Sequence, residues 1–268
     1  MAGTNVWMQV FERRESASLR LLCFPFAGGG AQAFRPWLAQ LPSGVELCAA
    51  QLPGREMRLR ETPFSDARAL VRAMLPELMT HTDKPFVLYG HSMGALIAYE
   101  TARLMQEEHS VSPVRLIVSG RVAPHFALAR LPINKLPQDE FIAGLKQLNG
   151  TPREILEDND LISLIGPMLR ADLAIHEEYV HGPGPRLACD ILAFGGLCDT
   201  EAGRAGLNAW AEMTAGKLTV RMLPGDHFFI QTAQSLFLRV LSIELNRLIG
   251  GLPGTAALAQ SQQCKANG

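Results

Sequence analysis

One stretch decides the fold of this chain: Phe86-Val-Leu-Tyr-Gly-His-Ser-Met-Gly-Ala-Leu-Ile-Ala98. An apolar run leads into the pentapeptide Gly90-His-Ser-Met-Gly94, and a second apolar run follows it at once. This order predicts a strand, a sharp turn and a helix, the setting in which a serine becomes a nucleophile. Glycine at both ends of the pentapeptide lets backbone approach backbone in the turn. We therefore predict that Ser92 begins a helix and exposes its hydroxyl above a sheet.

Strand and helix patterns alternate on both sides of this turn. The strand patterns lie at residues 19–24, 45–50, 86–89, 114–119, 189–194 and 218–223. The helix patterns lie at residues 32–40, 65–79, 93–106, 203–214 and 235–248. Such alternation is typical of a parallel sheet covered by helices on both faces. We therefore expect one α/β domain over residues 1–249, with a mainly parallel central sheet.

The alternation is interrupted between about residues 125 and 185, where only helical patterns occur. They cover residues 139–148, 152–157 and 161–179. A wholly helical stretch inside an α/β pattern indicates an insertion that caps the sheet rather than extending it. We interpret it as a helical lid.

Composition bounds the class of protein. The 268 residues include 25 basic and 26 acidic side chains, a formal net charge of −1 that offers no electrostatic attraction for nucleic acid. No apolar run reaches the ~20 residues of a membrane span, and residues 1–20 lack the apolar core of a signal peptide. We therefore expect a cytoplasmic protein without nucleic-acid or membrane partners, with a monomer as the default. The tail, residues 250–268, is predicted to be disordered.

The five cysteines do not indicate a disulfide framework or a metal site. Cys23, Cys48 and Cys189 lie in apolar, strand-like segments, whereas Cys198 and Cys264 lie outside them. An odd count without a signal peptide argues against disulfides, and there is no C-x-x-C pair for zinc. We therefore expect free thiols, no metal and no cofactor.

A serine on such a turn needs an acid and then a histidine later in the chain. Asp199 follows the strand pattern at 189–194, and His227 follows the one at 218–223. Both therefore lie in loops beyond strand ends, where ligands bind in open α/β sheets. We select Asp199 and His227 as the candidate acid and base for Ser92.

Each candidate has competitors. Asp190 should begin its strand, at the wrong end of the sheet, and Asp226 is too close in sequence to His227 to reach its imidazole well. The alternative role of Ser92 is a helix cap, and that of any single histidine is a surface or core position. We expect His91, beside Ser92, to point away and pack against the turn.

An oxyanion hole requires two backbone N–H groups aimed at one point. The amide of Met93, directly after the nucleophile, is the first candidate donor. The second should come from the loop Phe26-Ala-Gly-Gly-Gly30, which follows the strand at 19–24. The alternative for this loop is an ordinary glycine turn, but its place after the strand favours the functional role.

Four motifs together resemble those of type II thioesterases, the stand-alone editing enzymes of polyketide and nonribosomal peptide assembly lines. The motifs are Phe24-Pro-Phe-Ala-Gly-Gly-Gly30, Gln51-Leu-Pro-Gly-Arg-Glu56, Gly90-His-Ser-Met-Gly94 and Leu223-Pro-Gly-Asp-His-Phe-Phe229. The helical insertion is similar to the lid of that family at residues 136–141, 148–152 and 169–172. The resemblance covers roughly residues 18–248 and implies an α/β-hydrolase fold.

The resemblance also implies roles for individual residues. Ser92, Asp199 and His227 would form the catalytic triad, and the amides of Ala27 and Met93 would form the oxyanion hole. The implied substrates are acyl groups held as thioesters on the phosphopantetheine arm of acyl- or peptidyl-carrier proteins. The implied task is the editing of misprimed or stalled synthases, as in antibiotic or siderophore biosynthesis.

Two positions depart from the family pattern. Many relatives carry a histidine at the position of Phe26, and a proline often follows the aspartate where this chain has Thr200. The backbone amides of the loop at 26–30 do not depend on the Phe26 side chain, so we expect the oxyanion hole to be retained.

A carrier protein is usually acidic, which makes basic patches relevant. Arg55, Arg58 and Arg60 lie close together in the sequence, but Glu56 and Glu61 are interspersed among them. We interpret this segment as a solvated charged loop rather than a docking patch.

Two alternatives to a thioesterase stay open. One is another enzyme of the same fold, either an esterase or an acyltransferase that passes the acyl group from serine to an alcohol or amine. The other is a non-catalytic binding module, since a fold does not fix a function. The complete set of nucleophile, base and acid candidates counts against the binding module.

Overall fold

The structure is a computed structural model that describes residues 7–128 and 130–252. Within these ranges, no helix is both long enough and apolar enough to span a bilayer. Cys23, Cys48 and Cys189 are buried free thiols and Cys198 is an exposed one, while Cys264 lies outside the described residues.

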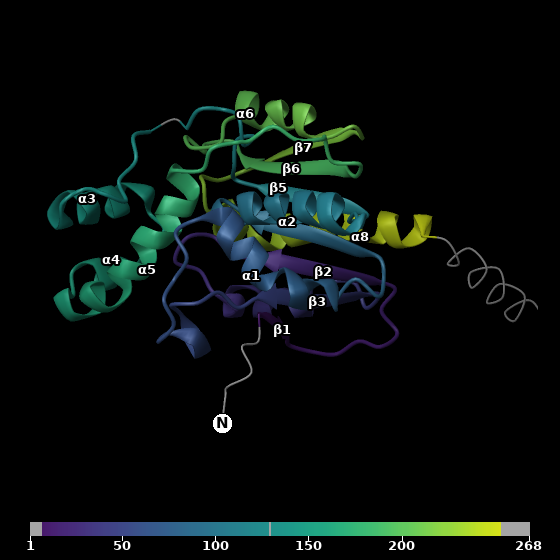
Figure 1. Cartoon of the computed structure of the whole chain (residues 1–268), viewed down its shortest axis with the longest axis horizontal. Coiled ribbons are helices and arrows are strands. Elements are labelled where there is room, and N and C mark those ends of the chain that lie inside the picture. The colour runs from purple at the N-terminus through teal and green to yellow at the C-terminus, as the bar shows by residue number, and fades with distance from the viewer. Residues whose placement is uncertain (1–6, 129, 253–268) are drawn as a thin grey trace, which may run out of the picture.

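The described residues form a seven-stranded sheet, as Figure 1 shows in side view. Its strands are β1 (Met8–Val10), β2 (Leu19–Phe24), β3 (Val45–Ala50), β4 (Phe86–His91), β5 (Arg115–Ser119), β6 (Asp190–Gly196) and β7 (Leu218–Leu223). They lie in the order β1-β3-β2-β4-β5-β6-β7, and β1 alone pairs antiparallel with its neighbour. The predicted, mainly parallel sheet is therefore confirmed, with β1 as an unpredicted edge strand.

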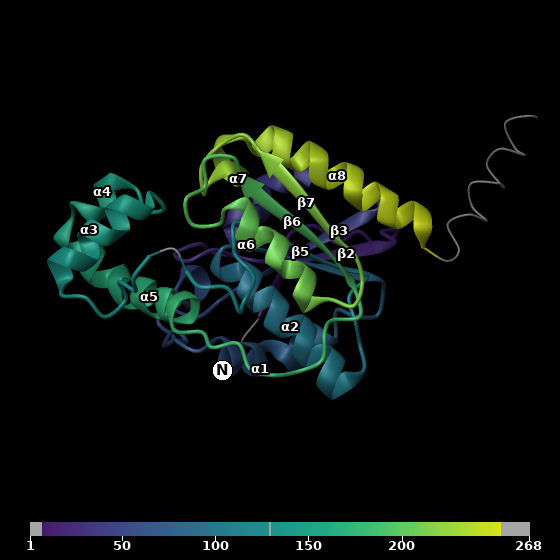
Figure 2. The same ribbon diagram turned by 90° about the horizontal axis from the view of Figure 1, so that it is seen from above.

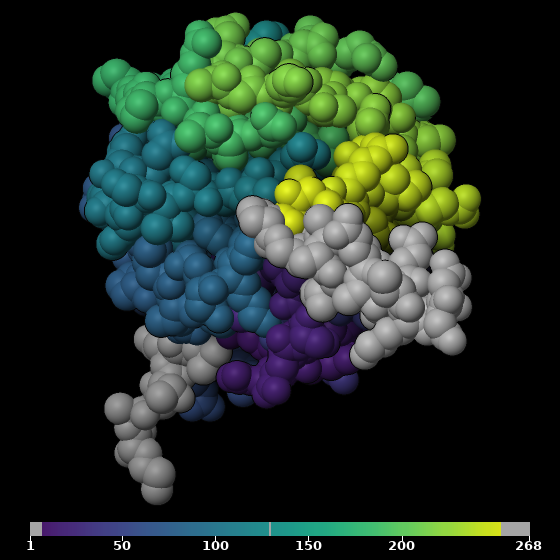
Figure 3. All heavy atoms as spheres, turned by 90° about the vertical axis from the view of Figure 1, so that its right-hand side faces the viewer, coloured from purple at the N-terminus to yellow at the C-terminus, as the bar shows by residue number. Residues whose placement is uncertain are grey.

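Helices cover both faces of the sheet (Figure 2). The helices are η1 (Ala31–Ala39), η2 (Glu56–Arg58), α1 (Ala67–Met79), α2 (Met93–His109), α6 (Arg204–Asn208), η3 (Ala209–Met213), α7 (Phe229–Thr232) and α8 (Gln234–Gly251). Side chains alternate along the buried strands: Leu22 packs into the layer with α1 and α2, and Leu21 into the layer with η1 and α8. Viewed from the side opposite α3 and α4, the yellow atoms of α8 lie below the green atoms of the later part of the chain (Figure 3).

The helical insertion comprises α3 (Gln138–Leu148), α4 (Arg153–Leu156) and α5 (Asn159–Glu177). Helices α3 and α4 stand beyond one end of the sheet, and α5 leads back towards it (Figures 1 and 2). The insertion has an apolar cluster of its own around Phe141, Leu145 and Leu173. Burial of a side chain such as Phe141 contributes roughly 1.5–3 kcal/mol relative to an exposed position.

Several bounds differ from the sequence predictions for local physical reasons. Helix α1 begins at Ala67 instead of residue 65, because the carboxylate of Asp66 caps it by accepting the backbone N–H of Ala69 at 2.8 Å. The predicted helix at 203–214 is divided into α6 and the 3₁₀ helix η3. Helix α8 includes Gly250 and Gly251, two residues past the predicted start of the tail, and residues 253–268 of that tail lie outside the described residues.

The junction of β4 and α2 leaves no room for side chains at its two glycines. Ser92 connects them with φ 55° and ψ −117°, a conformation that few non-glycine residues adopt. A Cβ atom on Gly90 would lie 2.0 Å from the carbonyl oxygen of Gly94, and one on Gly94 would lie 2.1 Å from that of Phe24. Both obstacles are backbone atoms, so neither can rotate away.

We predict that Gly94→Ala lowers the free energy of unfolding by at least about 3 kcal/mol, because the added methyl group forces β2 and α2 apart. The matched control is Gly250→Ala in α8, where a Cβ atom would meet nothing within 4 Å. That variant should change stability by no more than about 1 kcal/mol, in the stabilising direction. Urea unfolding followed by circular dichroism measures both. Equal stabilities of the two variants would contradict the packing described here.

Candidate active site

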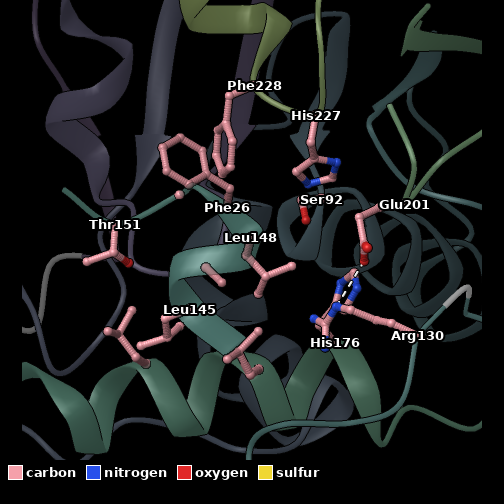
Figure 4. Close-up of a pocket in the computed structure, with 14 residues that line it drawn as sticks. Phe26, Ser92, Arg130, Leu145, Leu148, Thr151, His176, Glu201, His227 and Phe228 are labelled. Atoms are coloured by element: carbon pink, nitrogen blue, oxygen red, sulfur yellow. Dashed lines mark hydrogen bonds and ion pairs between the residues drawn. The ribbon is translucent and has the colours of Figure 1, made fainter. Parts of the chain in front are cut away.

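The residues selected from the sequence meet at the carboxyl ends of the parallel strands. Ser92 follows β4, Asp199 follows β6 and His227 follows β7. Ser92 and His227 line one cavity, with the serine hydroxyl beneath the imidazole ring in Figure 4. The fold therefore brings together three residues that are far apart in the sequence.

Asp199 holds the imidazole of His227. The Nδ1 atom of His227 lies 3.1 Å from Oδ2 and 3.2 Å from Oδ1 of Asp199. Oδ1 also accepts the backbone N–H groups of Glu201 and Ala202, at 2.8 and 3.1 Å. Burial alone would raise the pKa of Asp199, but the hydrogen bond and charge of His227 and these N–H groups lower it below its ordinary value. The ionised carboxylate therefore fixes the proton on Nδ1 and leaves Nε2 free to accept one.

The two competing aspartates lie elsewhere. Asp190 begins β6, at the opposite end of the sheet, and its carboxylate pairs with Arg115 at 3.3 Å. Asp226 accepts the backbone N–H of Phe228 at 3.0 Å. Asp199 is thus the one of these three carboxylates that contacts His227.

Ser92 is held by its backbone. Its N–H donates to the carbonyl oxygen of Ser119 at 2.8 Å, which ties the turn to the end of β5. Among residues 7–128 and 130–252, no hydrogen bond joins the Ser92 hydroxyl to the His227 ring. Such bonds often tighten only when substrate is bound.

The two candidate oxyanion donors lie on segments in direct contact. Ala27 lines the same cavity as Ser92, and Met93 is the first residue of α2. The Cα atom of Gly94 packs against the carbonyl groups of Phe24 and Pro25, which places the start of α2 against the loop that carries Ala27. Gly28 continues this loop with φ 79°, a left-handed conformation that glycine adopts without strain.

His91 packs behind the site. Its Nδ1 lies 2.9 Å from the hydroxyl of Ser119, and its ring centroid is 5.1 Å from that of His227. Burial, together with the nearby His227, lowers the pKa of His91 well below its ordinary value. His91 is therefore a neutral packing partner of the candidate base, and the rings of Phe26 and Phe228 pack beside it with centroids 6.0 Å away.

The cavity is narrow and mostly apolar, with a volume of about 50 Å³. The lid supplies four leucines to its wall: Leu145, Leu148, Leu169 and Leu173. Phe26 and Phe228 close another side, with ring centroids 5.5 Å apart (Figure 4). Phe26 therefore belongs to the apolar wall.

A polar corner of the cavity was not predicted from the sequence. It contains Arg130, His176 and Glu201 (Figure 4). Arg130 pairs with Glu201 at 3.0 Å and also with Glu177. Burial and the nearby Arg121 lower the pKa of His176 well below its ordinary value, so this ring is neutral. No motif marks these residues, because they come from the lid and from a loop distant in the sequence.

The prediction of a solvated charged loop after β3 is wrong for Arg55 and Arg58, because both side chains are buried. Arg58 is buried, pairs with Glu61 and stacks over the Trp7 ring at 3.9 Å from its centroid. Arg55 is also buried and pairs with Asp172, 117 residues later. Local sequence carries no signal for a partner at that distance.

Across residues 7–128 and 130–252, no group of three or more His, Cys, Asp or Glu side chains is arranged to hold a metal ion. The chemistry available at the cavity is that of a hydroxyl nucleophile, an imidazole base, a carboxylate and backbone N–H donors.

Comparison with known proteins gives the family. A thioesterase-domain family model matches residues 19–243. The gramicidin S biosynthesis protein GrsT of Aneurinibacillus migulanus is 40% identical over 230 residues, covering 86% of this chain and 90% of that protein. The thioesterase PikA5 of Streptomyces venezuelae is 33% identical over 228 residues, covering 85% and 81%.

Solved structures agree with the sequence comparison. The structure of BorB, the type II thioesterase from the borrelidin biosynthetic cluster, superposes with a TM-score of 0.80 at 32% identity. It covers 89% of this chain and 97% of that one. The resemblance inferred from four short motifs is thus confirmed over most of the chain. The protein belongs to the thioesterase family, as a relative of the type II thioesterases, and is a thioester hydrolase with the α/β-hydrolase fold.

Proposed function

We propose that this protein removes acyl groups from the phosphopantetheine arm of carrier proteins, as an editing enzyme of polyketide or nonribosomal peptide synthesis. Ser92, His227 and Asp199 form its catalytic triad. The observation that carries the proposal is the cavity in which Ser92 and His227 face each other while Asp199 fixes His227 from behind. The names of GrsT and BorB, which place those proteins in gramicidin S and borrelidin biosynthesis, support the assignment to such a pathway.

Acylation begins when Nε2 of His227 takes the proton of the Ser92 hydroxyl. The oxygen attacks the thioester carbonyl, and the N–H groups of Ala27 and Met93 stabilise the resulting oxyanion. The C–S bond then breaks, and His227 returns the proton to the departing pantetheine thiolate. A thiol with a pKa near that of cysteine, about 8.5, is a better leaving group than an alcohol or amine.

Deacylation repeats these steps with water. His227 takes a proton from a water molecule, whose oxygen attacks the acyl-serine carbonyl, and Ser92 leaves with that proton. Asp199 stabilises the imidazolium that exists in both halves of the reaction. The leucines of the lid surround the acyl group, so the lid selects the chains that reach Ser92.

Replacement of the nucleophile tests the proposal. We expect Ser92→Ala to lower kcat at least about 10³-fold on short acyl-pantetheine and acyl-carrier thioesters, because the attacking oxygen is absent. Release of free thiol measures the rate. The control is Ser242→Ala in α8, whose hydroxyl donates to the carbonyl oxygen of Gln40 at 2.9 Å and which should keep full activity. Normal turnover by Ser92→Ala would refute the triad, and transfer of the acyl group to added amines in preference to water would indicate an acyltransferase.

Replacement of the acid tests the role of Asp199. Asp199→Asn should lower kcat by about 10⁴-fold, because an amide can donate to Nδ1 and so favours the wrong tautomer of His227. Asp226→Asn is the matched control, since its amide oxygen can still accept the N–H of Phe228. Single-turnover hydrolysis of an acyl-pantetheine thioester compares the two. Similar rates for both variants would remove Asp199 from the triad.

A further inference from the structure

An ion pair joins the lid to the segment that follows β3. Both terminal nitrogens of Arg55 lie 2.7 Å from the carboxylate oxygens of Asp172 in α5, one nitrogen to each oxygen. The two side chains are 6% and 1% exposed. Such a pair gains little stability over a well-packed apolar pair, because both charges lose their hydration. The role of the Arg55–Asp172 pair therefore depends on the other groups to which it is hydrogen-bonded.

The remaining hydrogen bonds of this pair reach the loop that carries Ala27. The N–H of Gly28 donates to Oδ2 of Asp172 at 2.8 Å. Arg55 Nη1 donates to the carbonyl oxygen of Gly29 at 2.9 Å. The N–H of Gly28 and the carbonyl group of Gly29 are thus held by side chains from outside the loop. Both glycines directly follow Ala27, the candidate oxyanion donor.

Helix α5 also touches this loop through an apolar contact. A Cβ atom on Gly28 would lie 2.9 Å from a methyl group of Leu169, which stands one turn before Asp172 on the same face of α5. Leu169 lines the cavity beside Ser92. Helix α5 therefore contacts the loop through two neighbouring side chains, the cavity-lining Leu169 and the charged Asp172.

The residue next to Arg55 contacts the end of the same loop. Glu56 has φ 49°, and its carboxylate accepts the N–H of Gln32 at 3.1 Å. A Cβ atom on Gly30 would lie 2.1 Å from the same carboxylate oxygen. The loop at 26–30 therefore packs against both α5 and the segment after β3.

We infer that Arg55 and Asp172 are positioning residues that orient the Ala27 N–H towards the oxyanion, so that the oxyanion hole is complete only when α5 is seated. The inference rests on the proposed function, because it concerns the orientation of the Ala27 N–H, one of the two donors of the proposed oxyanion hole. An interaction that strengthens as the oxyanion forms lowers the barrier without tightening substrate binding. Loss of the pair should therefore lower kcat and leave KM nearly unchanged.

The test compares two buried ion pairs. Asp172→Asn keeps the shape of the side chain but turns an amide donor towards either Arg55 or the Gly28 N–H. Glu46→Gln makes the same change in the Arg20–Glu46 pair, whose side chains are 9% and 7% exposed, at the amino end of β3. Both variants lose one buried charge, and the second one does so far from Ser92.

We expect both variants to unfold at lower temperature, and only Asp172→Asn to lose kcat, by about 10–100-fold, with KM within about threefold of wild type. The affinity for a trifluoromethyl ketone that adds to Ser92 should fall by the same factor as kcat/KM. The affinity for an unreactive thioether analogue of the substrate should not change. A kcat loss shared with Glu46→Gln, or a loss carried by KM, would overturn the inference.

A double variant separates positioning from folding. Arg55→Met combined with Asp172→Leu removes both charges, so it should regain much of the stability lost by Asp172→Asn. It leaves the Gly28 N–H without its acceptor, and kcat should stay low. Recovery of kcat together with stability would show a purely structural role and refute the inference.

The outcomes also distinguish this inference from the proposed function. If Ser92→Ala retains turnover, the triad fails, and the kcat of Asp172→Asn no longer reports on an oxyanion at Ser92. If Ser92→Ala is inactive and Asp172→Asn has normal kcat, the triad stands and the positioning role alone is refuted. A fluorophosphonate probe that labels Ser92 in both wild type and Asp172→Asn verifies that the nucleophile is intact in the comparison.

Discussion

The site depends on a backbone-to-backbone contact between two segments that no side chain separates. Gly94, at the start of α2, packs against the carbonyl groups of Phe24 and Pro25 at the end of β2. This contact sets the distance between the serine turn and the loop that carries Ala27. Both candidate oxyanion donors are backbone N–H groups, so this contact brings their two segments together, while the side chains of Arg55 and Asp172 hold the loop that carries Ala27. A strained Ser92 is tolerated because its neighbours on β4, α2 and β5 leave it no other conformation.

Beside the cavity, one arginine is paired with carboxylates and two buried histidines, His91 and His176, are neutral. Arg130 is compensated by Glu177 and Glu201, and burial keeps His176 uncharged. An apolar cavity lined in this way presents an acyl chain with few competing hydrogen-bond partners. It also strengthens the electrostatic effect of Asp199 on His227, since few mobile dipoles screen the pair.

The sequence predicts the parts of this structure that depend on local pattern. Strands β2, β3 and β7 have their predicted bounds, because each is a short, mainly apolar run, and a proline directly follows β2 and β7. Strand β1 was missed because three residues carry too little pattern, and it forms through pairing with β3. Arg55 was interpreted as solvated because its charge is visible in the sequence and its partner Asp172 is not identifiable as such. The order of Ser92, Asp199 and His227 follows from sheet topology, whereas the polar corner at Arg130 depends on how the lid folds back.

The lid is more than a cover in this arrangement. Through Leu169 it lines the cavity beside Ser92, and through Asp172 it holds the loop beside Ala27. A lid that only excluded water would need neither a buried charge nor contact with a glycine in a left-handed conformation. Because Leu169 and Asp172 lie on one face of one helix, α5 cannot shift to admit a different acyl chain without moving the carboxylate that holds Gly28. In the proposed mechanism, acyl selection and oxyanion stabilisation are therefore linked through a single helix, and an acyl chain that displaces this helix loses catalysis as well as fit.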